Sequence, residues 1–129
     1  MLHHPDVQKK VQDELESVVG RNRFPSIVDR TKLCYTEATI CEIQRLSNVA
    51  PLAIAHRAME TAKLGDYIVP KNTITIISLY SMHMDEKYWK DPYEFRPERF
   101  LDEQGHLIQH DYFLPFGSGL FILLFKSFK

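Results

Sequence analysis

The stretch that most constrains this chain is residues 36–46, which has the periodicity of a helix and carries Glu42 and Arg45 among mainly apolar neighbours. On a projection of about 100° per residue, the two charges share one face with apolar and small side chains. These neighbours are Tyr35, Ala38, Leu46 and Val49, with Ile40 and Ile43 on the adjoining flank. A helix that is apolar over most of its circumference is expected to be buried. Because buried charges are costly unless paired, and one carboxylate cannot satisfy the five donors of an arginine, we predict a third partner elsewhere.

The residues before this stretch predict an amphipathic helix. Pro5 suits a first helical turn, and Gly20 is a suitable stop. Apolar residues recur between them at helical spacing, at Val7, Val11, Leu15 and Val18. A short helical piece is expected at 26–30. The central helix should end near residues 47–48, since Pro51 cannot continue it.

After Pro51 the periodicity changes from that of helices to that of strands. Residues 52–57, 67–69 and 73–77 read as short strands of a small antiparallel sheet, with a turn at 70–72. Residues 81–87 are expected to be helical. The aromatic- and proline-rich stretch 89–100 is predicted to be irregular but packed down. The fold class predicted is α+β, mainly α.

Composition and charge exclude several classes of protein. With 44% hydrophobic and 26% charged residues the chain resembles one soluble domain, and a net charge of −1 argues against nucleic acid as a partner. The apolar run at 120–125 is far shorter than the roughly 20 residues of a membrane span. The two cysteines, Cys34 and Cys41, form no disulfide or zinc pattern. The histidines His83, His106 and His110 are expected on the surface or in loops, because their spacing suggests no metal site.

Arg99, held between aromatic and proline residues in 95–100, is a candidate for the missing partner of Glu42. A Glu-x-x-Arg pair alone is weak evidence, because such pairs commonly stabilise exposed helices. The ordered combination of Glu-Ile-Gln-Arg at 42–45, the motif at 91–100 and Pro-Phe-Gly-Ser-Gly at 115–119 is more specific. It resembles the C-terminal part of a cytochrome P450, over nearly all of residues 2–119. The similarity is greatest to animal microsomal members and leaves the insect type open.

The resemblance implies an incomplete P450 fold and a set of site residues. Glu42, Arg45 and Arg99 would form a structural Glu-Arg-Arg network that braces the haem-binding loop, and no residue is assigned a catalytic role. His56 resembles a position that contacts a haem propionate, although a histidine satisfied within the sheet is an equally good interpretation. The partial haem site would be completed by residues of the loop, namely Phe116, Gly117 and Gly119.

The resemblance also implies a function for the intact family. Its members use haem b to oxidise an apolar small molecule with O2, taking NADPH electrons from NADPH-cytochrome P450 reductase. They are anchored in the endoplasmic reticulum membrane. The anchor and the distal half of the haem pocket would precede Met1, so this chain is expected to be cytosolic or degraded if it is made.

The chain departs from the family inside the haem-binding loop. The cysteine thiolate that binds haem iron is expected at position 123, which is Leu123, and no cysteine follows it. We therefore divide the chain into a P450 portion, 1–119, and an unrelated apolar tail, 120–129. No metal ligand is assigned, binding of haem by this chain is not expected, and the chain is predicted to be non-catalytic. The alternative is a truncated isoform or a gene-model fragment that acts, if at all, as a protein-interaction piece.

Overall fold

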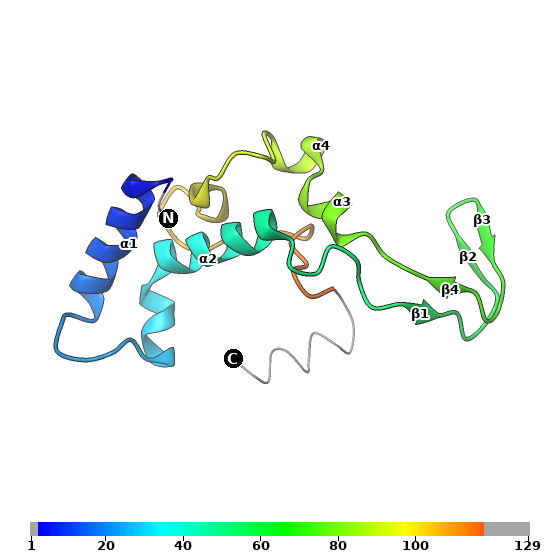
Figure 1. The fold of residues 1–129 in the computed structure, drawn as a ribbon, viewed down its shortest axis with the longest axis horizontal. Coiled ribbons are helices and arrows are strands. Elements are labelled where there is room, and N and C mark those ends of the chain that lie inside the picture. The colour runs from blue at the N-terminus through cyan, green and yellow to red at the C-terminus, as the bar shows by residue number, and fades with distance from the viewer. Residues whose placement is uncertain (1–2, 118–129) are drawn as a thin grey trace.

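The computed structural model describes residues 3–117, so the predictions for Gly119, Leu123 and the tail lie outside it. The α+β, mainly helical class is confirmed. The chain is elongated, with α1 and α2 toward one end and the strands at the other (Figure 1). The helices are α1 (Pro5–Val18), α2 (Cys34–Ser47), α3 (Leu79–His83) and α4 (Glu86–Trp89), with 3-10 helices η1 (Ile27–Lys32) and η2 (Pro97–Phe100). The strands are β1 (His56–Arg57), β2 (Ala62–Leu64), β3 (Tyr67–Val69) and β4 (Ile74–Thr75).

Helix α1 follows its sequence pattern closely. Pro5 occupies the first turn, where its missing N–H costs nothing, and the helix ends two residues before Gly20. Gly20 has a φ of 76° and returns its N–H to carbonyls of the last turn. Val7 and Val11 are buried, and α1 packs beside α2. The apolar stripe therefore does the packing that its spacing predicted.

Helix α2 buries a polar face. Ala38, Thr39, Glu42 and Arg45 are buried, whereas Ile40 and Ile43 keep 44% and 43% of their surface exposed. The prediction that this helix is covered on nearly all sides was therefore wrong within the described residues. Its C-terminus is well defined, because Asn48 adopts a left-handed conformation with φ of 43° and its side chain donates to the Arg45 carbonyl.

The core beside α2 is made by residues that the proline-rich stretch contributes. Ala38, Trp89 and Phe100 pack together, and Trp89 Nε1 donates to the Met82 carbonyl at 2.9 Å. The stretch is packed down, as expected, but it is not wholly irregular, because Pro97 starts the 3-10 helix η2. A proline is compatible with a first turn because its N–H would lack a partner there in any case.

The strands form two separate antiparallel ribbons in place of one small sheet. β1 pairs with β4 in the register His56 with Thr75, and β2 pairs with β3. The strand predicted at 52–57 is reduced to two residues, and β2 was missed. The β2–β3 hairpin lies at the end of the elongated molecule opposite α1 (Figure 1).

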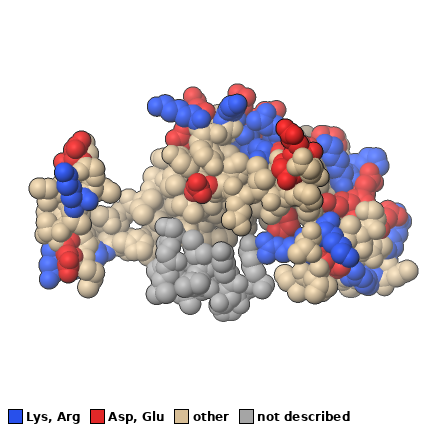
Figure 2. Space-filling model, turned by 180° about the vertical axis from the view of Figure 1, so that it is seen from behind, with Lys and Arg blue, Asp and Glu red and all other residues tan. Residues whose placement is uncertain are grey.

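The helix predicted at 81–87 is two short helices. α3 ends at His83, and α4 begins after Asp85, whose side chain accepts the N–H groups of Lys87 and Tyr88. No helix between residues 3 and 117 is long and apolar enough to cross a membrane. Acidic and basic side chains are intermixed over the face in Figure 2, without an extended area of one sign.

Candidate functional site

Glu42 and Arg45 form a bidentate ion pair inside the fold. Arg45 Nε donates to Glu42 Oε2 at 2.8 Å, and Arg45 Nη2 donates to Glu42 Oε1 at 2.9 Å. Both side chains are completely buried. Their spacing of three residues on α2 puts them on the same side of the helix, so the pair forms within one turn.

The third partner is Arg99 on η2. Its Nε donates to Glu42 Oε1 at 3.0 Å, and the backbone N–H of Arg96 donates to the same oxygen at 3.0 Å. The structure therefore brings together the three side chains of the predicted network. The contribution of the Arg96 backbone was not predicted, because nothing in a sequence pattern shows which main-chain donors face a carboxylate. We refer to Glu42, Arg45 and Arg99 as the Glu42 network.

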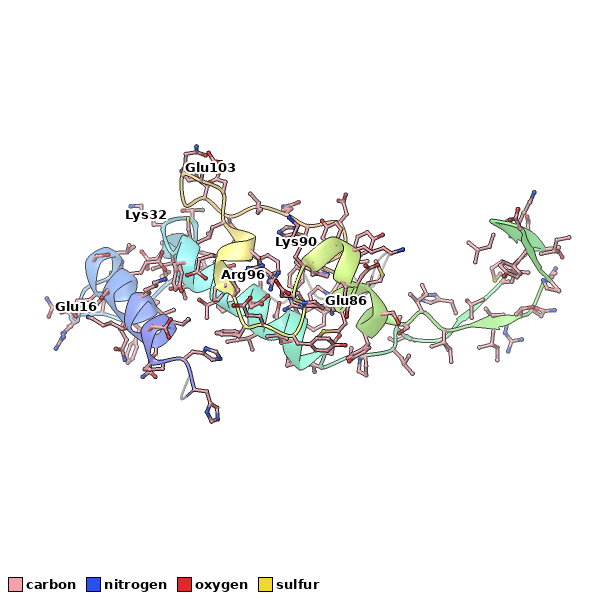
Figure 3. All side chains as sticks on the ribbon, turned by 90° about the horizontal axis from the view of Figure 1, so that it is seen from above. Glu16, Lys32, Glu86, Lys90, Arg96 and Glu103 are labelled. Carbon is pink, nitrogen blue, oxygen red and sulfur yellow. The ribbon has the colours of Figure 1, made fainter. Side chains whose placement is uncertain are left out.

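The other N–H groups of the two arginines donate hydrogen bonds to backbone carbonyls. Arg45 Nη1 donates to the His83 carbonyl at 2.8 Å. Arg99 spans the loop after α4 and reaches four carbonyls, those of Trp89, Lys90, Asp91 and Glu94. In Figure 3, Glu86 and Lys90 mark the α4 end of this loop and Arg96 its η2 end. The guanidinium groups therefore fix the path of residues 89–94 against α2.

That loop has an unusual backbone. Lys90 and Asp91 have φ values of 45° and 49°, in a region that L-residues other than glycine adopt at a cost. Arg99 donates to the carbonyls of both residues, so its hydrogen bonds offset part of that cost. The position of Arg99 and the strained turn are thus parts of one arrangement.

The electrostatics of the site match a structural role. Burial lowers the pKa of Arg99, and the neighbouring Glu42 carboxylate opposes this by favouring the charged form. The Arg45 guanidinium also lies over the Trp89 ring, 5.2 Å from its centroid. Among residues 3–117, no buried side-chain nitrogen or oxygen lacks a hydrogen-bond partner. With its buried nitrogen and oxygen atoms all hydrogen-bonded, the Glu42 network holds chain segments together, which fits a structural role.

A second carboxylate, which the sequence analysis missed, joins α1 to α2. Glu14 Oε1 accepts the N–H of Tyr35 at 2.8 Å, and Oε2 accepts the N–H and the hydroxyl of Thr36 at 2.8 and 2.6 Å. These backbone groups belong to the first turn of α2, where N–H groups lack partners within the helix. Glu14 looked like one more polar residue of an amphipathic helix, so its sequence context gave no sign of this contact.

The histidines differ in their surroundings. His83 is 1% exposed, so its expected surface or loop position was wrong. His110 is partly buried, and its Nε2 lies 2.8 Å from the Arg99 carbonyl. His106 is exposed beside Asp102. A helix was predicted at 81–87, but the spacing of its residues did not show that His83 would face inward.

The remaining candidate residues lie in two places. His56 is exposed on β1. Phe116 and Gly117 line a cavity of about 430 Å³ between α2 and the segment 107–117. His56 is absent from that lining. Ile40, Cys41 and Gln44 form the α2 wall of the cavity.

With the geometry described, comparison with known proteins decides the family. The sequence profile described as Cytochrome P450 matches residues 1–120. The chain belongs to the cytochrome P450 family.

Three relatives of this P450 chain illustrate the match. Cytochrome P450 2U1 of Mus musculus is 50% identical over 119 residues, covering 92% of this chain and 22% of the relative. Steroid 17-alpha-hydroxylase/17,20 lyase of Ictalurus punctatus is 47% identical over 126 residues, covering 96% of this chain and 24% of the relative. Farnesoate epoxidase of Bombyx mori is 45% identical over 119 residues, covering 92% of this chain and 24% of the relative. The chain thus spans between a fifth and a quarter of the length of these relatives.

Membership of the P450 family implies haem in its intact members, so the residues present can be tested against it. A haem-thiolate site needs a cysteine sulfur as axial ligand. Position 123 is leucine, and the two cysteines of the chain, Cys34 and Cys41, both belong to α2 and not to the loop segment where the family pattern places the ligand. The donor set therefore does not fit a haem-thiolate centre.

Proposed function

We propose that this chain is a non-catalytic piece of a cytochrome P450 monooxygenase. The observation that carries the proposal is Leu123, which replaces the expected thiolate with a hydrocarbon side chain that cannot bind iron. The Glu42 network also supports the proposal, because its arginines donate to the Glu42 carboxylate and to backbone carbonyls, which fits a structural role. Within the piece, the network has a structural role: it ties the loop 89–94 and η2 to α2.

The proposal extends to the intact proteins of which such a piece is a part. They would bind haem b, take NADPH electrons from NADPH-cytochrome P450 reductase at the endoplasmic reticulum membrane, and oxidise an apolar small molecule with O2. The names of two relatives, a farnesoate epoxidase and a steroid hydroxylase, support this class of substrate.

We also propose that residues 1–119 are the P450 portion and residues 120–129 an unrelated apolar tail. The family profile ends at residue 120, which supports this boundary. In the intact fold, His56 would face a haem propionate, and Phe116, Gly117 and Gly119 would contribute to the haem-binding loop. The φ of 82° at Gly117 supports a glycine requirement there, because other residues adopt such a conformation only at a cost.

Reconstitution with haem tests the non-catalytic assignment. The full chain is mixed with haemin, reduced and exposed to CO, with intact cytochrome P450 2U1 of Mus musculus as the positive control. We expect a thiolate-type Soret band from the control and none from this chain. A thiolate-type band from this chain would overturn the proposal, and the variants C34S and C41S would then identify the ligand.

A further inference from the structure

The side chain of His83, at the end of α3, makes two hydrogen bonds that are separate from the side-chain contacts of the Glu42 network. Its Nδ1 lies 2.9 Å from Asn48 Oδ1, and its Nε2 accepts the backbone N–H of Leu114 at 3.1 Å. A backbone N–H can only donate, so Nε2 carries no proton and Nδ1 is the protonated nitrogen that donates to Asn48. Asn48 Nδ2 in turn donates to the Arg45 carbonyl at 2.8 Å. The geometry therefore requires a neutral imidazole in one tautomer.

The neutral ring joins three segments that are distant in the sequence. Asn48 ends α2, His83 ends α3, and Leu114 belongs to the segment 107–117 that lines the cavity. The Phe113 ring lies 5.8 Å from the His83 ring, so the same segment also packs against it. The hydrogen bond to Leu114 thus ties the 107–117 segment to α3 and, through the His83–Asn48 contact, to the end of α2.

Protonation of His83 would turn the attractive contact between its Nε2 and the Leu114 N–H into a repulsive one. A proton on Nε2 would point at the Leu114 N–H, so the acceptor would be lost and two donors would face each other. The charged group that acts on His83 is Arg45 of α2, and its positive charge opposes a second cation. Asn48 and the Leu114 backbone are uncharged, so neither compensates. Burial, together with Arg45, lowers the pKa of His83 from 6.5 to about 4.

We propose that His83 is a proton-operated latch: its neutral imidazole holds the 107–117 segment against the end of α2, and its protonation releases that segment. The latch goes beyond the structural role proposed for the Glu42 network, because it acts on a different segment through a different residue. It requires neither haem nor a cysteine ligand.

The size of the pH effect on release follows from the difference between the pKa values of His83 in the latched and released states. If the released state has a histidine with a pKa of 6.5 and the latched state one of about 4, lowering the pH from 7 to 5 shifts the equilibrium toward release by about 20-fold. Well above pH 6.5 the histidine is neutral in both states, so the latch is at full strength there. Its contribution disappears as the pH falls toward 4.

Hydrogen exchange of the full chain tests the latch. Protection of the Leu114 amide, corrected for its intrinsic rate, is measured by mass spectrometry at pH 7 and pH 5, with α1 peptides as an internal reference. We expect about 20-fold lower protection at pH 5 for Leu114 and little change for α1. H106Q, which alters an exposed histidine, should behave as the parent chain does, whereas H83Q should lose the pH dependence.

A second variant guards against a general loss of structure in H83Q. Asn48 and His83 belong to α2 and α3, so the carboxylate of N48D stays beside Nδ1 after the 107–117 segment has left. It raises the pKa of the released histidine, so release should begin at a higher pH than in the parent chain. The latch is overturned if Leu114 protection in the parent chain is independent of pH, or if it is already absent at pH 7. It is also overturned if H83Q keeps the pH dependence. None of these results involves a haem spectrum, so failure of the latch is distinguishable from failure of the non-catalytic assignment.

Discussion

Glu42 and Arg99 stand 57 residues apart in the sequence, yet Arg99 Nε donates to Glu42 Oε1 at 3.0 Å, with 0% of the Glu42 side chain and 5% of the Arg99 side chain exposed. The contact is formed within the described residues 3–117 of this chain. Long-range buried ion pairs of this kind are sensitive to the loss of one member, because the other charge stays buried without compensation. The Glu42 network is therefore the place where single substitutions should have large effects.

Replacing Glu42 with glutamine should destabilise the chain by about 3–5 kcal/mol, because two buried guanidinium groups lose their counter-charge while the volume is unchanged. The free energy of unfolding from urea titration, followed by Trp89 fluorescence, measures the loss. E16Q is the matched control, since Glu16 pairs with Arg21 on the exposed side of α1. Equal unfolding midpoints for E42Q and E16Q would contradict a structural role for the Glu42 network.

Replacing Arg99 with lysine should loosen the loop 89–94 selectively. Lysine keeps the charge but cannot span Glu42 and the four backbone carbonyls at once, so we expect a loss of about 1–3 kcal/mol. The amides of residues 89–94 should exchange faster, since the loop's strained backbone loses its partners. R96K is the control, because the Arg96 side chain is partly exposed and only its backbone reaches Glu42. Unchanged hydrogen exchange of residues 89–94 in R99K would show that the loop keeps its shape without the Arg99 guanidinium.

The sequence predicted that Arg45 needs more acceptors than one carboxylate supplies, and the His83 carbonyl meets that need. Arg99 adds donors and no acceptor, so its place beside Glu42 was predictable only from the combination of motifs that resembles the family. The boundaries of α1 were predictable, since Pro5 and Gly20 have specific conformational preferences. Strand β2 was missed because its sequence, Ala-Lys-Leu, has no β-branched residue and gains its conformation from pairing with β3.

The burial of individual side chains was the least predictable property. Ile40 and Ile43 were expected inside and are partly exposed, whereas His83 was expected outside and is buried. A helical projection gives the angular position of a side chain but not which faces other segments cover. Glu14 shows the same limit, because its partners are backbone groups of another helix.

Asp29 gives the chain an acid-sensitive element. It accepts two hydrogen bonds from Arg23, at 2.6 and 2.8 Å, and the N–H of Ser26 at 2.9 Å. Arg23, and then the Ser26 N–H, lower the pKa of Asp29 from its usual 3.8 to about 2. A lowered pKa means that the stabilisation is complete above pH 4 and is lost as the pH falls toward 2.

We therefore expect D29N to be less stable than the parent chain at pH 6 and to lose less stability between pH 4 and pH 2. Thermal unfolding followed by far-ultraviolet circular dichroism at these pH values measures both differences. D13N is the control, since Asp13 is an exposed carboxylate that pairs with Lys9 of the same helix. Parallel pH profiles for D29N and the parent chain would exclude Asp29 as the source of the acid sensitivity.

Replacing Glu14 with glutamine should weaken the packing of α1 on α2. The carboxylate accepts three hydrogen bonds with its two oxygens, and glutamine has one acceptor oxygen, so at least one N–H at the start of α2 loses its partner. The expected loss is about 1–3 kcal/mol, the range for hydrogen bonds to a charged group. Urea unfolding measures it, and the amides of Tyr35 and Thr36 should exchange faster. E16Q, on the same helix but outside this contact, should leave those two amides unchanged. If E14Q and E16Q give the same exchange at Tyr35 and Thr36, α1 is held by its apolar stripe at Val7 and Val11, and Glu14 adds nothing to it.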